Sequence, residues 1–325
     1  MYRPLAQDNV VRALIGAAGA APSIHNTQPW RFRVTGDLIE VHGDPDRMLW
    51  VADPRGRALH LSCGAALFNL KLAIRVLGAK PLVWPLPDPQ NEPTLLASVQ
   101  LEESRPATAG EREMFEVIGQ RHTSRVPFSS HPIPDAVQVA LEQAATAEFA
   151  VLRALSVRDA ALVLELAAAA DKALEADFAH RVEMGQWIAT EGDDGVPAGA
   201  LPHHPDRAPA PVRDFGYAAP AIERPAGSYE LLPRLAVLST ARDEPGDWLR
   251  AGQALQRVLL TATRSGLATS LLYQPVELHD VRQEGPGWWP WPECPQIIVR
   301  FGYGPPGMSA PRRKLEDILD ERSPA

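Results

Sequence analysis

Cysteine is scarce in this chain of 325 residues, and long apolar runs are missing. The two cysteines, Cys63 and Cys294, lie far apart and lack metal-ligand spacing, which excludes a disulfide framework and a cysteine zinc site. No run reaches the ~18 consecutive apolar residues that cross a bilayer. These absences favour a cytoplasmic protein without a membrane partner.

Concentrated positive charge is missing as well. The sequence has 40 acidic against 32 basic residues, a formal net charge of -8, and no block of Lys and Arg longer than 312–314. Nucleic-acid surfaces need such blocks because they neutralise phosphates. We therefore expect no nucleic-acid partner. With 45% apolar residues, the chain can bury a substantial core.

The histidines lack the spacing of metal ligands. His203 and His204 are adjacent, and neighbouring side chains of an extended segment project to opposite sides. A metal site that combines them with His180 or Asp206 is the weakest hypothesis. We expect no metal.

The first 23 residues carry a basic residue, an apolar stretch and small residues, which are features of a secretory signal. Arg12 interrupts that stretch, however, and Val11, Leu14, Ile15 and Ala18 recur at helical spacing. We interpret the segment as a helix of the folded protein.

Two pairs of segments recur along the chain in the same order. Residues 8–20 (DNVVRALIGAAGA) match residues 135–147 (DAVQVALEQAATA), and residues 61–78 match residues 249–266. Both members of the second pair end on a glycine, as a left-handed helix cap requires. Chance likeness between Ala- and Leu-rich helices is the alternative, but two repeats in one order favour a duplication.

The second copy is longer than the first, with an insertion at 150–230. Within it, residues 158–188 are rich in Ala, Leu and Glu and should be helical, whereas residues 191–228 are crowded with Gly and Pro and predict a long loop. A β-like run follows the second helix of each copy, at 93–101 and at 295–302. Each copy therefore combines helices with a sheet, as an α+β fold does.

Polar side chains crowd the turn after the first helix, at 21–32 (APSIHNTQPWRF). This turn offers side-chain and backbone donors that suit the polar edge of a planar ligand, from Ser23, His25, Asn26, Thr27 and Gln28. A helix-ending Asx turn without any ligand is the other interpretation of the same residues.

Two arginines and a threonine alternate in residues 121–128 (RHTSRVPF). Arg121, Thr123 and Arg125 would project to one side of an extended segment, a geometry that suits a phosphate or an anionic ring. The alternative is a solvated basic strand. A second arginine pair, at 312–313, could complete an anion site or only add solubility.

Four segments together resemble the flavin-binding motifs of the FMN-dependent nitroreductase family. Residues 21–32 resemble the turn that lies against the flavin, and residues 121–128 resemble the Arg-x-Ser-x-Arg/Lys segment. Residues 266–277 (GLATSLLYQPVE) resemble the segment along the flavin face, and residues 311–317 (PRRKLED) resemble the terminal phosphate-binding segment. The four follow the family order over nearly the whole chain.

The resemblance implies an α+β, nitroreductase-like fold in two tandem degenerate copies, residues 1–110 and 111–325. Family members are usually homodimers with the flavin between subunits, but here the first copy has only the Pro-Ser-x-x-Asn turn and the second only the arginine motifs. The implied architecture is a fused pseudo-dimer with one composite FMN site per chain. It is similar to the fused, Acg-like subgroup, in which an insertion covers the flavin, so residues 191–228 are expected to form a lid.

Carried over from the family motifs, the FMN-binding residues fall into four groups. They are expected to be Pro22, Ser23, Ile24 and Asn26 along the isoalloxazine; Arg121, His122, Thr123 and Arg125 at the ring and phosphate; Leu271, Leu272, Tyr273 and Gln274 lining the flavin; and Arg312 and Arg313 at the phosphate. The resemblance departs at Tyr273 and Gln274, where many relatives have Glu-Gly, and Tyr273 would narrow the substrate space. We expect no catalytic acid or base, because hydride transfer through flavin N5 needs none.

Two functions therefore stay open. The first is an oxidoreductase that takes a hydride from NAD(P)H onto FMN and passes electrons to a small nitro compound or quinone. The second is a flavin-sequestering or storage protein that has a lid and little turnover. Because a fused pseudo-dimer already buries the family's dimer interface, we expect a monomer or a weak homodimer.

Overall fold

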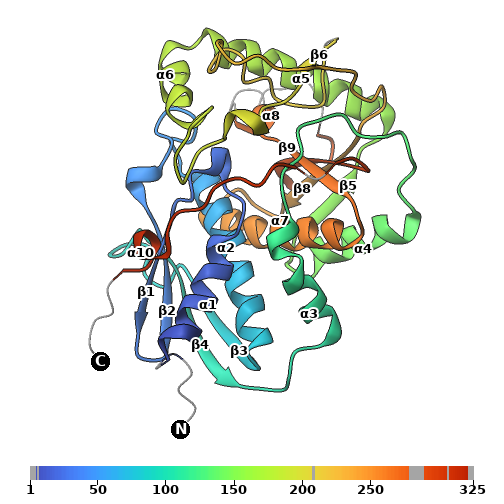
Figure 1. The fold of residues 1–325 in the computed structure, drawn as a ribbon. Coiled ribbons are helices and arrows are strands. Elements are labelled where there is room, and N and C mark those ends of the chain that lie inside the picture. Colours follow the sequence, from blue (N-terminus) through green and yellow to red (C-terminus); the bar gives the residue numbers. More distant parts are fainter. Residues whose placement is uncertain (1–4, 6, 207–208, 278–288, 306, 321–325) are drawn as a thin grey trace.

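Two antiparallel sheets and two long central helices organise the chain (Figure 1). The computed structural model describes residues 5, 7–206, 209–277, 289–305 and 307–320. The first sheet has the order β1-β2-β4-β3 and the second the order β5-β8-β10-β9.

Each half of the chain has its own run of elements. The N-terminal half contains α1 (Asp8–Gly19), β1 (Trp30–Thr35), β2 (Leu38–Gly43), α2 (Arg57–Val76), β3 (Ala79–Pro85) and β4 (Leu95–Glu103). The C-terminal half contains α4 (Asp135–Thr146), β5 (Val151–Ala154), β8 (Arg234–Thr240), α7 (Pro245–Arg264), β9 (Ala268–Leu272) and β10 (Cys294–Gly302). Between them lie α3 (Ala109–Glu116) and the 3-10 turn η4 (Ile118–Gln120).

The two halves share one topology. Each runs helix, strand, strand, helix, strand, strand, and their sheets have equivalent strand orders. The predicted helix pairs are present: α1 and α4 both have 12 residues, and α2 and α7 both have 20. The glycines after the second pair, Gly78 and Gly266, have φ of 89° and 74°, the left-handed caps expected of them. The predicted α+β class is confirmed.

The helices α2 and α7 cross in direct backbone contact. A Cβ atom on Gly64 would lie 2.2 Å from the carbonyl oxygen of Leu249, and one on Gly252 would lie 2.0 Å from that of Leu61. Gly64 and Gly252 match in the sequence repeat, as do Leu61 and Leu249. The reciprocal contacts relate the two halves by an approximate two-fold axis at this crossing.

Helix α2 is also long and apolar enough, by length and composition alone, to span a membrane. However, 78% of its apolar window is buried inside the protein, against α1, α7 and the first sheet. It is a core helix, and among the described residues no other helix meets the same test.

The insertion lies at the top of Figure 1, above both sheets. The segment predicted to be helical forms two helices, α5 (Val157–Ala176) and α6 (Phe178–Trp187), because the Asp177 carboxylate accepts the backbone N–H of Ala179 at 2.8 Å and caps α6. The loop 191–228 has only short elements: η5 (Ala198–Ala200), β6 (His204–Pro205) and β7 (Ala226–Gly227). Of the predicted lid, residues 207–208 lie outside the described residues.

After β10, the chain returns to the N-terminal half. The red segment in Figure 1 crosses the molecule and ends in α10 (Leu315–Ile318), which packs on α1 and β1. Leu319 forms a bridge with Phe32, and the Arg31 guanidinium donates to the Asp320 carboxylate at 2.9 Å. The chain's own C-terminal segment thus covers the outer edge of β1.

Replacing Gly252 by alanine should destabilise the protein. Because the new methyl group would meet backbone atoms of α2, which cannot rotate away, we expect the Gly252→Ala variant to lose roughly 1–3 kcal/mol of unfolding free energy. Urea unfolding measures this loss. The matched control is Gly16→Ala in α1, where no atom lies within 4 Å and alanine should add roughly 0.5–1 kcal/mol. Equal effects of both changes would contradict the close crossing.

Candidate functional site

Three distant segments meet at one cavity between the two halves. They are the turn after α1, the segment before α4 and the C-terminal segment before α10, and residues of the insertion loop complete the lining. The cavity is small, about 50 Å³, and a second of about 40 Å³ shares Ser23, Thr123 and Arg125 with it. The lining of the first comprises Pro22, Ser23, Asn26, Arg121, His122, Thr123, Arg125, Gly195, Val196, Pro197, Ala200, Met308, Ala310 and Arg312.

The turn after α1 has an unusual backbone. His25, Asn26 and Gln28 have φ of 45°, 57° and 48°, in the left-handed region that non-glycine residues seldom adopt. The Ser23 hydroxyl fixes the turn by accepting the Gln28 backbone N–H at 2.9 Å. Such conformations cost on the order of 1–3 kcal/mol each and cluster where a site requires a particular backbone shape.

Arg121 is a buried cation with no anionic partner among the described residues. Its side chain is 3% exposed, and its Nε has no hydrogen-bond partner. Burial, together with the nearby guanidinium of Arg312, lowers the pKa of Arg121 to about 9. Two arginines that face one another without a carboxylate form a site whose charge an anion would balance.

Arg312 and Arg125 complete this positive site. Arg312 donates to the Asn26 side-chain oxygen at 3.1 Å and to backbone carbonyls, and its Nε is buried without a partner. Arg125 donates to the carbonyl of Ala200 at 3.2 Å. Burial lowers the pKa of each of these two arginines to about 10. None of these contacts is to a carboxylate, so they do not neutralise the positive charge of the arginines.

The second cavity is aromatic and lies under the insertion loop. Phe215 from that loop packs edge-on against His25, with ring centroids 5.7 Å apart, and its ring lies 5.8 Å from the Arg125 guanidinium. Arg213 and Tyr273 line the same space. Burial and the charges of Arg213 and Arg125 hold the pKa of His25 well below its usual range, so His25 is neutral at physiological pH.

Ten of the fourteen predicted flavin-binding residues line these two cavities. Leu271 and Tyr273 reach the second one, and the other eight are in the lining of the first. The remaining four point elsewhere. They are Ile24 and Leu272, which are buried in apolar clusters; Gln274, which donates to Asp171 at 3.2 Å; and Arg313.

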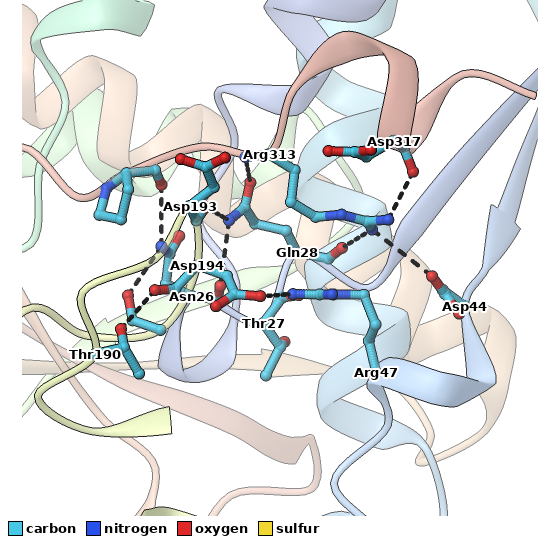
Figure 2. Close-up of polar contacts among 12 residues, drawn as sticks. Asn26, Thr27, Gln28, Asp44, Arg47, Thr190, Asp193, Asp194, Arg313 and Asp317 are labelled. Atoms are coloured by element: carbon cyan, nitrogen blue, oxygen red, sulfur yellow. Dashed lines mark hydrogen bonds and ion pairs between the residues drawn. The ribbon is translucent and has the colours of Figure 1, made fainter. Parts of the chain in front are cut away.

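Arg313 faces away from the cavity although its neighbour Arg312 faces into it. Its guanidinium lies 3.7 Å from the Asp44 carboxylate and donates to the backbone carbonyls of Gln28 and Asp317 (Figure 2). This geometry assigns Arg313 to fastening the C-terminal segment, and leaves Arg312 as the cation of that segment at the cavity.

Sequence reasoning missed the residues that the insertion loop contributes. Arg213 and Phe215 line the second cavity, and Gly195, Val196 and Pro197 line the first. The sequence held one signal for this part of the site. Arg213 and Phe215 place a cation and an aromatic residue two positions apart in a loop otherwise rich in Ala and Pro. His25 counts among the polar groups of the turn but not among the predicted flavin-binding residues, and it lines the second cavity.

Side chains of the turn hold the insertion loop in place (Figure 2). The amide of Asn26 donates to the carbonyl of Gly195 at 3.0 Å, and that of Gln28 donates to the carbonyl of Asp193 at 2.9 Å. Beside them, Arg47 forms an ion pair with Asp194. The polar side chains of the turn are therefore hydrogen-bonded to other protein segments, and the charged groups that face the cavity are mainly arginines.

Within the part of the chain that the structure describes, no group of three or more His, Cys, Asp or Glu side chains could hold a metal ion. The arginines of the first cavity and the aromatic rings of the second place an anion pocket beside an aromatic pocket.

Comparisons with known proteins agree with this architecture. No family model matches the chain. A protein of Mycobacterium tuberculosis H37Rv, provisionally named NAD(P)H nitroreductase acg, is 32% identical over 328 residues, which cover 97% of this chain and 96% of the relative. A second, provisionally named NAD(P)H nitroreductase Rv3131, is 34% identical over 327 residues, covering 95% and 91%.

Among solved structures, a provisionally assigned nitroreductase from Anabaena variabilis shares the fold, with a TM-score of 0.50 and 10% identity over 91% of this chain and 88% of that one. The fold is therefore that of the nitroreductases. With its full-length mycobacterial relatives, the chain belongs to the nitroreductase family.

His180, behind Arg213, should make stability depend on pH. Burial, followed by the charge of Arg213, lowers the pKa of His180 from its usual 6.5 to about 4. Because the folded state binds this proton more weakly than the unfolded state, the stabilisation is full above pH 6.5 and is lost as the pH falls towards 4. By pH 5 the loss should be roughly 2 kcal/mol.

Urea unfolding at pH 7 and pH 5 tests this linkage. We expect His180→Gln to lose less stability than the wild type between the two pH values, whereas His131→Gln, at an exposed histidine, should lose as much as the wild type. If all three proteins lost the same amount, His180 would not be the titrating group.

Proposed function

We propose that the chain binds one FMN and works as an NAD(P)H-dependent oxidoreductase that reduces a small nitro compound or quinone in the cytoplasm. One observation carries the proposal. Arg121 is buried beside Arg312 without a carboxylate partner, at the point where the turn of one half meets the arginine segment of the other. The names of the mycobacterial relatives support the same reaction class.

The residues fit FMN by charge. Its phosphate dianion would lie between Arg121 and Arg312, whose unpartnered Nε groups are donors for phosphate oxygens. Arg125 and the backbone of the Pro22–Asn26 turn would hold the ring, where a cation favours the negative charge of the reduced form. When bound, FMN supplies a hydride acceptor at N5, and the protein supplies only binding and orientation.

By volume, the described cavities are smaller than a flavin. They measure about 50 and 40 Å³, whereas sites for ligands of that size span roughly 300–1,000 Å³. Residues of the insertion loop line both cavities. The proposal therefore includes movement of this loop as FMN enters, with the arginines already in position.

The asymmetry between the halves supports a single site per chain. The turn after α4, at 147–150, is the counterpart of the flavin turn, and there Glu148 pairs with Lys71 and with Arg257, each at 2.9 Å. A buried carboxylate that already neutralises the local cations would repel a phosphate. We infer a fused pseudo-dimer in which one composite site, between residues 1–110 and 111–325, is retained.

Flavin sequestration is the second candidate, and a specific set of contacts favours it. The Arg47–Asp194 ion pair and the bonds from Asn26 and Gln28 fasten the insertion loop over the site. A loop held closed over FMN would keep a nicotinamide from the flavin and leave a storage protein with little turnover.

Charge reversal at Arg121 tests the composite site. Arg121→Glu places an anion where the phosphate should bind, so flavin per chain after loading with FMN should fall at least tenfold, from about one in the wild type. The absorbance of bound flavin measures this. Arg158→Glu, at an exposed arginine of α5, is the matched control and should load fully. Full loading of a folded Arg121→Glu protein would refute the assignment.

Anaerobic mixing with NADH and with NADPH distinguishes the two candidates. If the protein turns over, the flavin should bleach rapidly. Arg47→Ala removes the ion pair that holds the insertion loop, so its flavin should bleach several-fold faster than that of the wild type or of the control variant Arg158→Ala. Colour that persists with both nucleotides in every variant, but is bleached by dithionite, would exclude the oxidoreductase and support sequestration.

A further inference from the structure

Strands β1 and β5 are the equivalent edge strands of the two sheets, and they differ in whether another segment covers their outer edge. The outer edge of β1 is covered by the chain's own C-terminal segment, through the Leu319–Phe32 bridge and the Arg31–Asp320 ion pair. The counterpart of β1 in the other sheet is β5, which pairs on its inner side with β8. The equivalent covering segment would follow β4, but there the chain continues into α3, which packs on α2 and α7 instead.

The outer edge of β5 presents backbone groups that no described residue pairs. The Leu155 N–H donates to the carbonyl of Leu235 at 2.9 Å, so hydrogen-bonded pairing with β8 falls on alternate residues, at Arg153 and Val151. The N–H and C=O groups of Leu152 and Ala154 therefore point outward. Open edges of this kind pair readily with another strand.

Apolar surface surrounds this edge. A cavity of about 620 Å³ lies between α4, β5, α5 and residues 230–236, and Leu141, Leu152 and Leu164 are among its lining. It shares no lining residue with the two cavities of the proposed flavin site. A second hollow, of about 410 Å³, is lined by all four residues of β5 together with Trp291 and residues of α4.

Large exposed apolar side chains gather around the same strand. Phe149, directly before β5, is 84% exposed, and Val157, at the start of α5, is 64% exposed. Leu231 and Leu232, at the rim of the cavity, are 74% and 64% exposed. Exposed apolar residues that cluster beside an unpaired strand edge mark an interaction surface.

We propose that two copies of the chain associate through antiparallel pairing of their β5 strands across a two-fold axis. The outer edge of β5 can pair with the same edge of a second copy, because its outward N–H and C=O groups belong to residues two positions apart, Leu152 and Ala154. An antiparallel copy places Leu152 opposite the partner's Ala154 and Ala154 opposite the partner's Leu152. The exposed apolar side chains at the ends of β5 then meet the second copy instead of water.

Charge at the axis is compatible with this pairing. The axis passes at Arg153, where two copies would place like charges opposite each other. Arg153 is already paired with Glu293 at 2.7 Å, and its guanidinium lies 5.6 Å from the Trp291 ring. Each copy therefore brings its own counter-charge, and the pairing joins two four-stranded sheets into one of eight.

Sedimentation equilibrium of the full chain tests the proposal, with and without FMN. We expect a concentration-dependent species of twice the chain mass of 35.4 kDa. Ala154→Pro removes only an outward N–H, and Leu231→Lys places a charge in the apolar rim, so each should weaken the dimer at least tenfold. Trp84→Lys, at an exposed apolar residue of the other sheet, should leave the dimer intact. A wild-type chain that stays monomeric at every concentration overturns the proposal.

A cross-link tests the register independently of affinity. At the axis, Arg153 of each copy occupies a non-hydrogen-bonded position, where Cα atoms lie about 4.5 Å apart, close enough for a disulfide. Arg153→Cys should form a covalent dimer on mild oxidation. Arg33→Cys, on the covered β1, is the control for disulfides through Cys63 or Cys294 and should not cross-link. Equal cross-linking of both variants, or none, would refute the β5 pairing.

Discussion

The backbone contact between α2 and α7 is the constraint on which the rest of the structure depends. Gly64 and Gly252 each face a carbonyl oxygen of the opposite helix, so only hydrogen fits at either position. Because the two contacts are reciprocal, they set both the distance and the relation between the halves. The turn after α1 and the arginine segment before α4 meet at one cavity as a result of that relation.

The positive charges buried at that cavity are electrostatically unfavourable. Arg121, Arg125 and Arg312 are buried or partly buried without a carboxylate partner, and burial lowers the pKa of each. At the turn after α4, the counterpart of the turn after α1, the arrangement is the opposite, because Glu148 neutralises Lys71 and Arg257. One half-site thus favours an anion and its counterpart does not, which accounts physically for a duplicated fold with a single proposed cofactor site.

Part of this could be predicted because it is local. Helix spacing and repeated residues located α1, α2, α4 and α7, and the glycine caps marked the ends of the second pair. The choice between Arg312 and Arg313 could not be predicted, since adjacent residues of an extended segment point to opposite sides and nothing in the motif fixes which side is inward. Arg213 and Phe215 were missed because a long loop has no periodicity from which to infer its contacts.

The fold class, the family and the positions of the repeated helices could be inferred from the sequence, because they depend on periodicity, capping and short motifs. Only the packed chain shows which arginine enters the cavity, which side chains fasten the insertion loop and which sheet edge no described residue pairs. These outcomes depend on contacts between residues more than 100 positions apart, such as Arg47 with Asp194 and Asn26 with Arg312. Such contacts follow from how the halves pack, and the packing is fixed by the crossing at Gly64 and Gly252.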